Sequence, residues 1–385
     1  MTFGVRWLSV GPGSGYGDAG VAYRAGLRAV GIPVSWTPLG WPSLAWNAAH
    51  GPVEAATVRG VGQLETADEA IEHDTVVVHS PPLWHSRLLE EADGRALVAC
   101  TTWETDRVPQ DWVEILNCYD RVLVPSRFNA TVFERSGVQP PVHVVPHVVK
   151  RSSASRLRRR SGRFVFYLIA TWTSRKAILD AVFAFMRAFT AQDAVELVIH
   201  TTPEDHIARA RLQRTGTPHV AAESGTWFSL ARALAGRRSV PDITLTTRVL
   251  DPRELDDLHT ACDCFLLLSH GEGWGLGAFD AAASGNPVIV TGWGGTLEFL
   301  PDSYPYCVEY DLVPTTTAEP DAWWAPLPAE RWANARIGHA AELLRRAFEH
   351  RDEARRWGIA LQSHVHESFS ETRITRALID ALDGR

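Results

Sequence analysis

Short apolar runs alternate with helix-like patterns along most of the chain. Before residue 149 these runs predict strands at Val5–Val10, Val34–Thr37, Val76–His79, Ala96–Thr101, Arg121–Val124 and His143–Val145. After residue 162 they predict strands at Phe164–Ala170, Val195–His200, Ile243–Thr246, Cys264–Leu268 and Val288–Thr291. This alternation is typical of βαβ units and parallel sheets. From about Ala333 to Leu382 the pattern predicts helix, with an apolar stripe through Ile337, Ala341, Leu344 and Phe348.

A polar segment divides the chain. Residues 149–162 (VKRSSASRLRRRSG) are rich in Ser and Arg and have no apolar periodicity, which is typical of a solvated linker. We therefore expect an α/β fold of two Rossmann-like, doubly wound domains, at residues 1–148 and 163–367. A last helix, at about 368–385, is expected to pack back on the first domain. Ligands of such sheets bind at the carboxyl ends of the strands, which favours a cleft between two facing domains.

Composition narrows the class of partner. The chain has 385 residues and a net charge of −7, which argues against non-specific binding to nucleic acid or to an anionic membrane. No apolar run approaches the roughly 18 residues of a membrane span. The first ten residues predict a strand and not a signal peptide. The five cysteines form no C-x-x-C pair, which favours reduced thiols and a cytoplasmic protein.

Lysine is rare in this chain. It occurs only at Lys150 and Lys176, while nearly every other basic position is Arg. A lysine kept against this bias supplies a compact point charge, so Lys176 becomes a candidate for the site.

A glycine-rich loop follows the first predicted strand. Gly15, Gly17 and Gly20 match the G-x-G-x-x-G fingerprint, with Tyr16 between the first two. Amides at a helix N-terminus attract phosphate. The fingerprint also needs an acidic residue at the end of the second strand, but Val34–Gly40 has none, which disfavours a nicotinamide dehydrogenase. The loop either makes a sharp turn only, or lines the cleft near phosphates or acceptor.

The strongest signal lies at Ser269–Asp280 (SHGEGWGLGAFD), where a predicted strand runs into a loop with four glycines and then a helix. A helix N-terminus with unpaired amides and a positive dipole end suits a diphosphate. Glu272 precedes the helix and Asp280 lies about one turn inside it, so the two carboxylates can contact opposite ends of an extended ligand. Carboxylates accept well from sugar and ribose hydroxyls.

This stretch resembles the E-x7-E region of the retaining GT-B glycosyltransferases of family 4. Three further segments are similar to parts of that family: Arg121–Asn129, Tyr167–Lys176 and Gly294–Glu298. The resemblance covers most of the chain. It implies a GT-B fold, with an acceptor domain first and a nucleotide-sugar donor domain second.

The resemblance also implies roles for individual residues. Arg175 and Lys176 would bind the diphosphate, Glu272 the transferred sugar and Asp280 the ribose hydroxyls. Arg248 falls where the base is usually held, although a surface role for it is equally open. The expected donor-binding residues are Gly15, Tyr16, Gly17, Arg248, Gly273, Trp274, Gly275, Leu276, Gly277 and Asp280.

Two departures from the family pattern affect these roles. The family usually has Glu where this chain has Asp280, which is one methylene shorter. Many relatives also carry a His after an N-domain strand, whereas this chain has Trp103 and Glu104 near that place. His79 is the nearest alternative, with a structural role at a strand end equally open. Glu104 either binds an acceptor hydroxyl or caps a turn.

The expected reaction is transfer of a sugar from a UDP- or GDP-linked donor to a hydroxyl of a saccharide or natural-product acceptor. No D-x-D-like pair follows a strand, so we expect no metal and no cofactor, with Arg175, Lys176 and the helix N-terminus meeting the phosphate charge. Several of the fifteen Trp residues fall in predicted loops, where aromatic faces suit sugar rings. The alternatives are a GT-B epimerase or phosphorylase-like enzyme, a Rossmann oxidoreductase, and a non-catalytic nucleotide-binding module.

Overall fold

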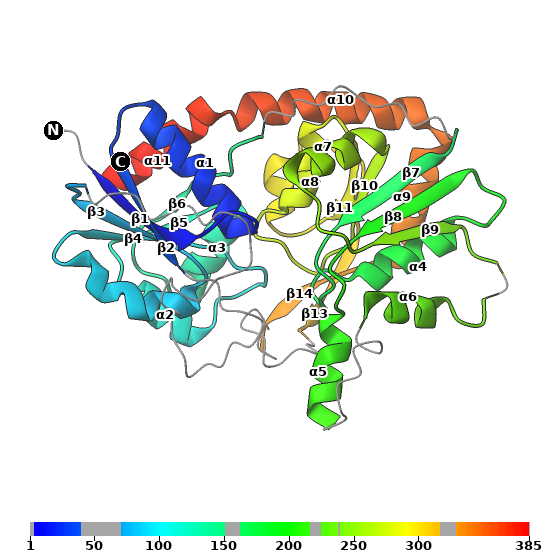
Figure 1. Ribbon diagram of the computed structural model, residues 1–385, viewed down its shortest axis with the longest axis horizontal. Helices are drawn as coiled ribbons and strands as arrows, with labels where there is room; N and C mark the ends of the chain where they lie inside the picture. Colours follow the sequence, from blue (N-terminus) through cyan, green and yellow to red (C-terminus); the bar gives the residue numbers. More distant parts are fainter. Residues whose placement is uncertain are drawn as a thin grey trace. The chain divides into compact units, whose positions relative to one another are not determined.

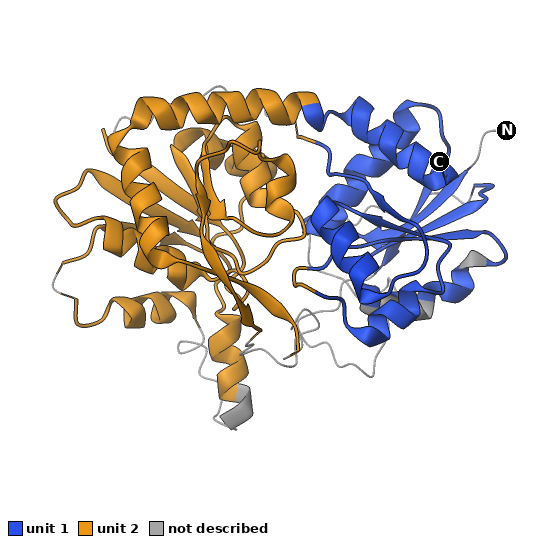
Figure 2. Cartoon of the chain, turned by 180° about the vertical axis from the view of Figure 1, so that it is seen from behind, with its two compact units in different colours: residues 1–103, 107–148, 368–385 blue, residues 104–106, 149–367 orange. Residues whose placement is uncertain are grey.

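The chain forms two compact units in the computed structural model, which describes residues 4–39, 71–150, 162–215, 225–237, 239–315 and 329–384. Unit 1 comprises residues 1–103, 107–148 and 368–385, and unit 2 comprises residues 104–106 and 149–367 (Figure 2). Most of the expected linker, residues 151–161, lies outside the described residues, as does Gly40.

Unit 1 contains a six-stranded parallel sheet in the order β2–β1–β3–β4–β5–β6, flanked by helices (Figure 1). Its strands are β1 (Val5–Val10), β2 (Val34–Leu39), β3 (Thr75–His79), β4 (Ala96–Cys100), β5 (Arg121–Val124) and β6 (Val142–Val144). Its helices are α1 (Gly15–Ala29), the 3₁₀ helix η2 (Pro82–Ala92), α2 (Gln110–Leu116), α3 (Arg127–Ser136) and α11 (Glu371–Asp383).

Helix α11 completes unit 1 although it comes last in the sequence. It packs on α1, where a side chain at Gly26 would overlap the Thr375 hydroxyl. Leu378 and Leu382, four residues apart on α11, are buried, as expected for the inner face of an amphipathic helix. The C-terminal residues therefore supply part of the core of unit 1.

Unit 2 contains a second six-stranded parallel sheet, in the order β12–β11–β10–β7–β8–β9, and a small antiparallel pair, β13–β14 (Figure 1). Its strands are β7 (Phe164–Ile169), β8 (Val195–His200), β9 (Asp242–Thr246), β10 (Cys264–Leu267), β11 (Val288–Thr291), β12 (Cys307–Val308), β13 (Tyr310–Pro314) and β14 (Arg331–Ala335). Its helices are α4 (Ile178–Ala188), α5 (His206–Thr215), α6 (Thr226–Leu234), α7 (Pro252–Ala261), α8 (Leu276–Ala283), the 3₁₀ helix η3 (Gly295–Phe299), α9 (Ile337–Glu349) and α10 (Arg351–Ser368).

Burial explains why these segments become strands. β7 and β10 are continuous apolar runs with almost every residue buried, which is typical of parallel strands covered by helices on both faces. Phe166 of β7 packs against Phe185 of α4 and against Phe189. Read from β9 to β12, the strand order of unit 2 is the Rossmann order: successive strands are added on one side of β7 up to β9 and then on its other side from β10.

The expected α/β class with two parallel-sheet units is confirmed, and the predicted strands begin and end within one or two residues of the observed ones. The prediction of helix from Ala333 is wrong at its start. Arg331–Ala335 forms β14 and pairs antiparallel with β13, and helix α9 begins at Ile337. β14 has its own reason to form: Trp332 and Ala333 are buried, and Trp332 stacks on the His270 ring at 4.5 Å.

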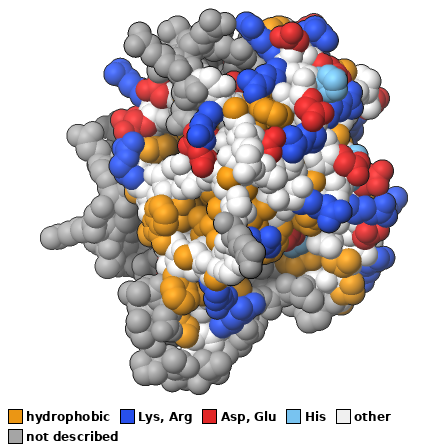
Figure 3. All heavy atoms as spheres, turned by 90° about the vertical axis from the view of Figure 1, so that its right-hand side faces the viewer, with side chains coloured by type: hydrophobic (Ala, Val, Ile, Leu, Met, Phe, Trp, Pro, Cys, Tyr) orange, Lys and Arg blue, Asp and Glu red, His pale blue; other side chains and the backbone are white. Residues whose placement is uncertain are grey.

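Two surface properties bear on partners. Among the described helices, none is long and apolar enough to cross a membrane. On the face in Figure 3, acidic and basic side chains are interspersed and do not separate into areas of one sign.

A candidate nucleotide-sugar site

The sheet order of unit 2 places its site. The strand order reverses between β7 and β10, and in open α/β sheets ligands bind at such a switch point, at the carboxyl ends of the strands. Arg175 and Lys176 lie in the loop after β7, and Glu272 lies in the loop after β10. The order of strands thus brings together groups that are about a hundred residues apart in sequence.

Four charged side chains meet at this point: Glu104, Arg175, Lys176 and Glu272, here called the charged quartet. Lys176 Nζ donates to Glu272 Oε1 at 2.6 Å, and Arg175 lies 3.4 Å from Glu272 Oε2. Arg175 also lies 3.6 Å from Glu104 Oε1 and donates to the Gly271 carbonyl at 2.7 Å. All four side chains are less than one-fifth exposed. Buried charges persist only when paired, so the quartet is a set of mutual counter-ions.

The carboxyl groups of the quartet respond differently to their surroundings. Burial on its own would raise the pKa of Glu272, but Lys176 and Arg175 hold it below the ordinary value. Burial raises the pKa of Glu104, with Arg175 opposing the rise and the neighbouring Glu272 adding to it. Burial also lowers the pKa of the Lys176 ammonium, against the attraction of Glu272. Glu272 is therefore the well-compensated carboxylate of the quartet, and Glu104 the poorly compensated one.

Glycines let two loops approach each other at backbone distance behind Glu272. A Cβ at Gly295 would overlap the Gly273 carbonyl, and Gly295 N donates to the Glu272 carbonyl at 2.7 Å. A Cβ at Gly271 would overlap the Glu104 carbonyl. Gly271 and Gly295 are thus explained by close packing that fixes the backbone around Glu272.

Helix α8 begins directly after these loops. Gly275 precedes it with φ +90°, a left-handed conformation that favours glycine, so the first amides of the helix belong to Leu276 and Gly277. Asp280 lies on α8, and its carboxylate accepts from Lys150 Nζ at 3.2 Å. The two lysines of the chain therefore pair with the two carboxylates of the motif, Lys176 with Glu272 and Lys150 with Asp280.

The side chains of two predicted donor-binding residues point elsewhere. Trp274 is 3% exposed and packs against Phe279 and Phe299, so its indole is a core group and only its backbone remains for a ligand. Arg248 is exposed and pairs with Glu254 at 2.5 Å, beside the capping box of α7. In this structure Arg248 thus holds the start of α7.

A buried polar network lies behind α8. The Tyr167 hydroxyl is 2.7 Å from His259 Nδ1, and Asn286 Nδ2 donates both to that hydroxyl at 2.9 Å and to the His259 carbonyl at 2.5 Å. Burial lowers the pKa of His259 to about 4, so the ring is neutral. The network joins β7, α7 and the end of α8, and so fixes the base of the switch point.

In unit 1, the glycine-rich loop of the fingerprint is explained largely by packing. A Cβ at Gly17 would overlap the Gly11 carbonyl, and Gly20 lies against His79 and Ser9. The Asp18 carboxylate accepts from Gly13 N at 2.9 Å, which places a negative charge at the loop. Gly15 is exposed at the first position of α1.

Tyr16 and His79 lie at the switch point of unit 1, between β1 and β3. Their rings are 5.4 Å apart, and the Tyr16 hydroxyl is 3.4 Å from Thr101 Oγ1 at the end of β4. His79 is 3% exposed, and no described residue hydrogen-bonds its Nδ1. Burial, followed by the charges of His147 and Arg24, lowers its pKa well below the ordinary value, so the imidazole is neutral.

The sequence left open whether His79 or Glu104 faces the reacting centre. Glu104 lies in the charged quartet of unit 2, while His79 lies in the core of unit 1. The sequence did not predict that residues 104–106 would join unit 2, because the flanking residues on both sides belong to unit 1. The one available signal was the acidic residue three positions beyond a predicted strand.

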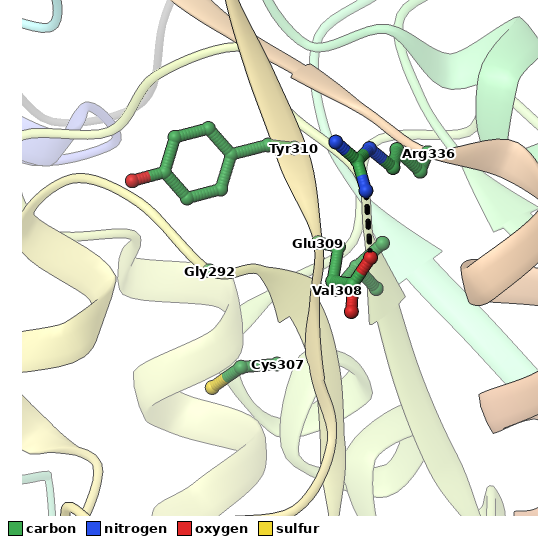
Figure 4. A pocket seen from close by; sticks show the side chains of 6 residues that line it. All are labelled: Gly292, Cys307, Val308, Glu309, Tyr310 and Arg336. Atoms are coloured by element: carbon green, nitrogen blue, oxygen red, sulfur yellow. Dashed lines mark hydrogen bonds and ion pairs between the residues drawn. The ribbon is translucent and has the colours of Figure 1, made fainter.

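A separate hollow of about 330 Å³ opens beside β11 and β13, lined by Gly292, Cys307, Val308, Glu309, Tyr310 and Arg336 (Figure 4). Arg336 points toward Glu309 and is paired with it at 2.9 Å. None of the predicted site residues lines this hollow. Among the described residues, no three His, Cys, Asp or Glu side chains gather as metal ligands would.

The fold is that of known GT-B structures. HepE from Anabaena, solved with UDP and glucose, matches with a TM-score of 0.62 at 12% identity over 100% of both chains. TarM from S. aureus, solved with UDP, matches with a TM-score of 0.56 at 12% identity, over 80% of this chain and 55% of that one. A UDP-forming trehalose-phosphate synthase from Burkholderia xenovorans matches with a TM-score of 0.57 at 14% identity, over 80% and 73%.

The class is therefore GT-B, two Rossmann-like units in one chain. Residues 123–365, more than half of the chain, match the family described as Family 4 Glycosyltransferase in conflict systems. The chain belongs to this family of glycosyltransferases. No curated protein sequence matches it.

Proposed function

We propose that the protein transfers a sugar, with retention of configuration, from a nucleotide-sugar to a hydroxyl of a saccharide or natural-product acceptor. The observation that carries this proposal is the charged quartet at the switch point of unit 2, next to the first turn of α8. Buried cations and the first amides of a helix at one switch point suit a diphosphate.

Arg175 and Lys176 are the proposed partners of the donor diphosphate. Both side chains are mostly buried, so they are desolvated before the donor arrives, and their attraction for phosphate is weakly screened. Together with the amides of Leu276 and Gly277 they supply positive charge for the leaving diphosphate. This supports a reaction in which protein groups, rather than a metal ion, meet the phosphate charge.

Glu272 and Asp280 are the proposed partners of the donor's hydroxyl groups. Glu272 is held ionised by its two cations, so it accepts from the hydroxyls of the transferred sugar. Asp280 lies about one turn along α8 from the diphosphate amides and accepts from the ribose. Its shorter side chain, compared with the usual Glu, is accompanied here by Lys150, which binds the same carboxylate.

The donor base and the retention of configuration are proposed from the similarity of this chain to other glycosyltransferases. The solved structures of HepE and TarM contain UDP, which favours a UDP-linked sugar. Retention follows from the resemblance to the retaining enzymes of family 4. All five cysteines are free thiols, which supports a cytoplasmic location.

The test begins with a panel of UDP-, GDP-, TDP- and ADP-sugars, screened for thermal stabilisation, because a bound donor raises the melting temperature. With the donor identified in this way, Glu272→Gln is expected to have a kcat/KM about ten- to a hundredfold lower than wild type. This loss corresponds to the free energy of one buried hydrogen bond to a charged group. Glu309→Gln, which removes an exposed carboxylate of the same unit, is the matched control. Near-wild-type transfer by folded Glu272→Gln contradicts the proposal.

A further inference from the structure

The charged quartet is electrically balanced before any ligand binds. Its two carboxylates, Glu104 and Glu272, are matched by the two cations Arg175 and Lys176. A diphosphate group brings further negative charge to this balanced set. The diphosphate can bind tightly only where one of the carboxylates weakens its own contact with a cation.

The two carboxylates hold the cations unequally. Glu272 makes a short bond to Lys176 and a second contact to Arg175, whereas among the described cations Glu104 contacts only Arg175, at 3.6 Å. That separation exceeds hydrogen-bond length, so the pair of Glu104 and Arg175 is held by charge alone. Of the two carboxylates, Glu104 is the one that a diphosphate displaces at least cost.

Glu104 cannot leave the site by movement of its backbone. Its carbonyl packs on Gly271, the Thr105 hydroxyl donates to buried Glu330 at 2.6 Å, and Arg331 N donates to Asp106 at 2.7 Å. Asp106 N in turn donates to the Arg331 carbonyl at 3.0 Å. The negative charge of Glu104 therefore stays beside Arg175, and only rotation of the side chain lets it make room.

We propose that Glu104 is an internal competitor of the donor's diphosphate for Arg175, which limits the affinity for nucleotide and speeds release of the nucleoside diphosphate product. This rests on the proposed function, in which Arg175 binds the diphosphate. The two contacts compete for Arg175, so a change that weakens the contact between Glu104 and Arg175 strengthens the contact between the phosphate and Arg175.

A kinetic consequence separates this role from a structural one. When Glu104 is neutral, both the donor and the nucleoside diphosphate bind more tightly, so KM for the donor falls. Product leaves more slowly, so kcat falls as well where release limits turnover. Damage to the fold or to a sugar contact lowers kcat/KM and does not tighten nucleotide binding.

The experiment compares the affinities of wild type and Glu104→Gln for UDP, GDP, TDP, ADP and inorganic pyrophosphate by isothermal titration calorimetry. Glu104→Gln is expected to bind the cognate nucleoside diphosphate and pyrophosphate about tenfold more tightly, within the usual range of coupling between two sites. In an Arg175→Ala background the same substitution is expected to change these affinities less than about twofold.

Asp106→Asn is the matched control. It removes one negative charge from the same segment and keeps the oxygen that accepts from Arg331, so affinity is expected to stay within about twofold of wild type. Glu104→Ser is the second charge-removing variant, in case Glu104→Gln does not fold.

Two failures are distinguishable. Unchanged or weaker pyrophosphate binding by folded Glu104→Gln and Glu104→Ser overturns the competition. Wild type that binds pyrophosphate but none of the four nucleoside diphosphates contradicts the proposed function instead, while the competition at Arg175 is still measured.

Discussion

At the scale of single residues, the main feature of the site is that the charged side chains of the quartet are buried and stabilise one another. Glu272 is 7% exposed at its side chain and remains ionised because Lys176 and Arg175 both face it. Lys176 in turn depends on Glu272, since burial alone favours its neutral form. The same pairing that makes the cations available for phosphate also makes each member costly to remove.

Lys176→Met is therefore expected to lower the free energy of unfolding by roughly 1–3 kcal/mol, because it leaves Glu272 with Arg175 alone in a buried site. Urea denaturation measures the loss. The matched control is Lys150→Met at the only other lysine, which is 56% exposed and is expected to cost less than about 1 kcal/mol. Equal losses in the two variants contradict this account of the quartet.

The sequence predicted which residues gather here better than which way their side chains point. Glu272, Arg175 and Lys176 follow buried strands, so the topology of a parallel sheet brings them to one edge. The indole of Trp274 is buried and Arg248 pairs with Glu254, and both facts depend on neighbours that come from elsewhere in the chain. The place of Glu104 likewise depends on contacts with Gly271 and Arg331, which no local pattern contains.

At the scale of elements, two loops and one helix form the frame of the site. Gly295 opens η3 against the Gly273 carbonyl, and Gly275 turns the chain into α8. The frame is stiff because these are contacts between backbones, which have no side chain that could give way.

Gly295→Ala is expected to destabilise unit 2 by roughly 2 kcal/mol or more and to weaken nucleotide binding, because the added methyl forces the two loops apart. Gly338→Ala is the control: it lies in α9 with open space around its Cβ, so a helical Ala there is expected to stabilise by about 0.5–1 kcal/mol. Thermal and urea unfolding measure both. A neutral effect of Gly295→Ala contradicts the close loop packing.

Elements with strong periodicity were predictable, and short ones were not. The long apolar runs of the two parallel sheets mark their strands within one or two residues. β14 is a five-residue strand that leads directly into α9, and residues 315–330 separate it from its pairing partner β13. Such a strand depends on its partner and on the stacking of Trp332 on His270, and neither is visible in the local sequence pattern. The helical pattern of the residues that follow therefore led to a prediction of helix here.

At the scale of the whole molecule, each unit buries neutral imidazoles. Burial lowers the pKa of His85 in unit 1 and of His259 in unit 2 to about 4 each. The unfolded values lie near 6.5, so between pH 6.5 and about 4 the unfolded chain binds more protons than the folded one. The stability that these two neutral histidines contribute is therefore fully present above pH 6.5 and is lost as the pH falls through that window.

Each of these histidines is expected to contribute a fall of up to about 1.4 kcal/mol per pH unit in the free energy of unfolding. Denaturation at pH 7, 6 and 5 measures the slope. His259→Gln keeps an acceptor for the Tyr167 hydroxyl and removes one titrating group, so its slope is expected to be shallower by about one proton. A slope equal to that of wild type contradicts a neutral, buried His259.

The pairing of both lysines with the carboxylates of the motif has a practical consequence for chemical labelling. Apart from the α-amino group, amine-directed acylation can modify this chain only at Lys150 and Lys176. Lys150 is 56% exposed and Lys176 19%, so the first is expected to react well before the second. Peptide mass spectrometry after brief acylation, with and without a nucleotide, thus gives a footprint of the donor site in which both internal reporters are native residues.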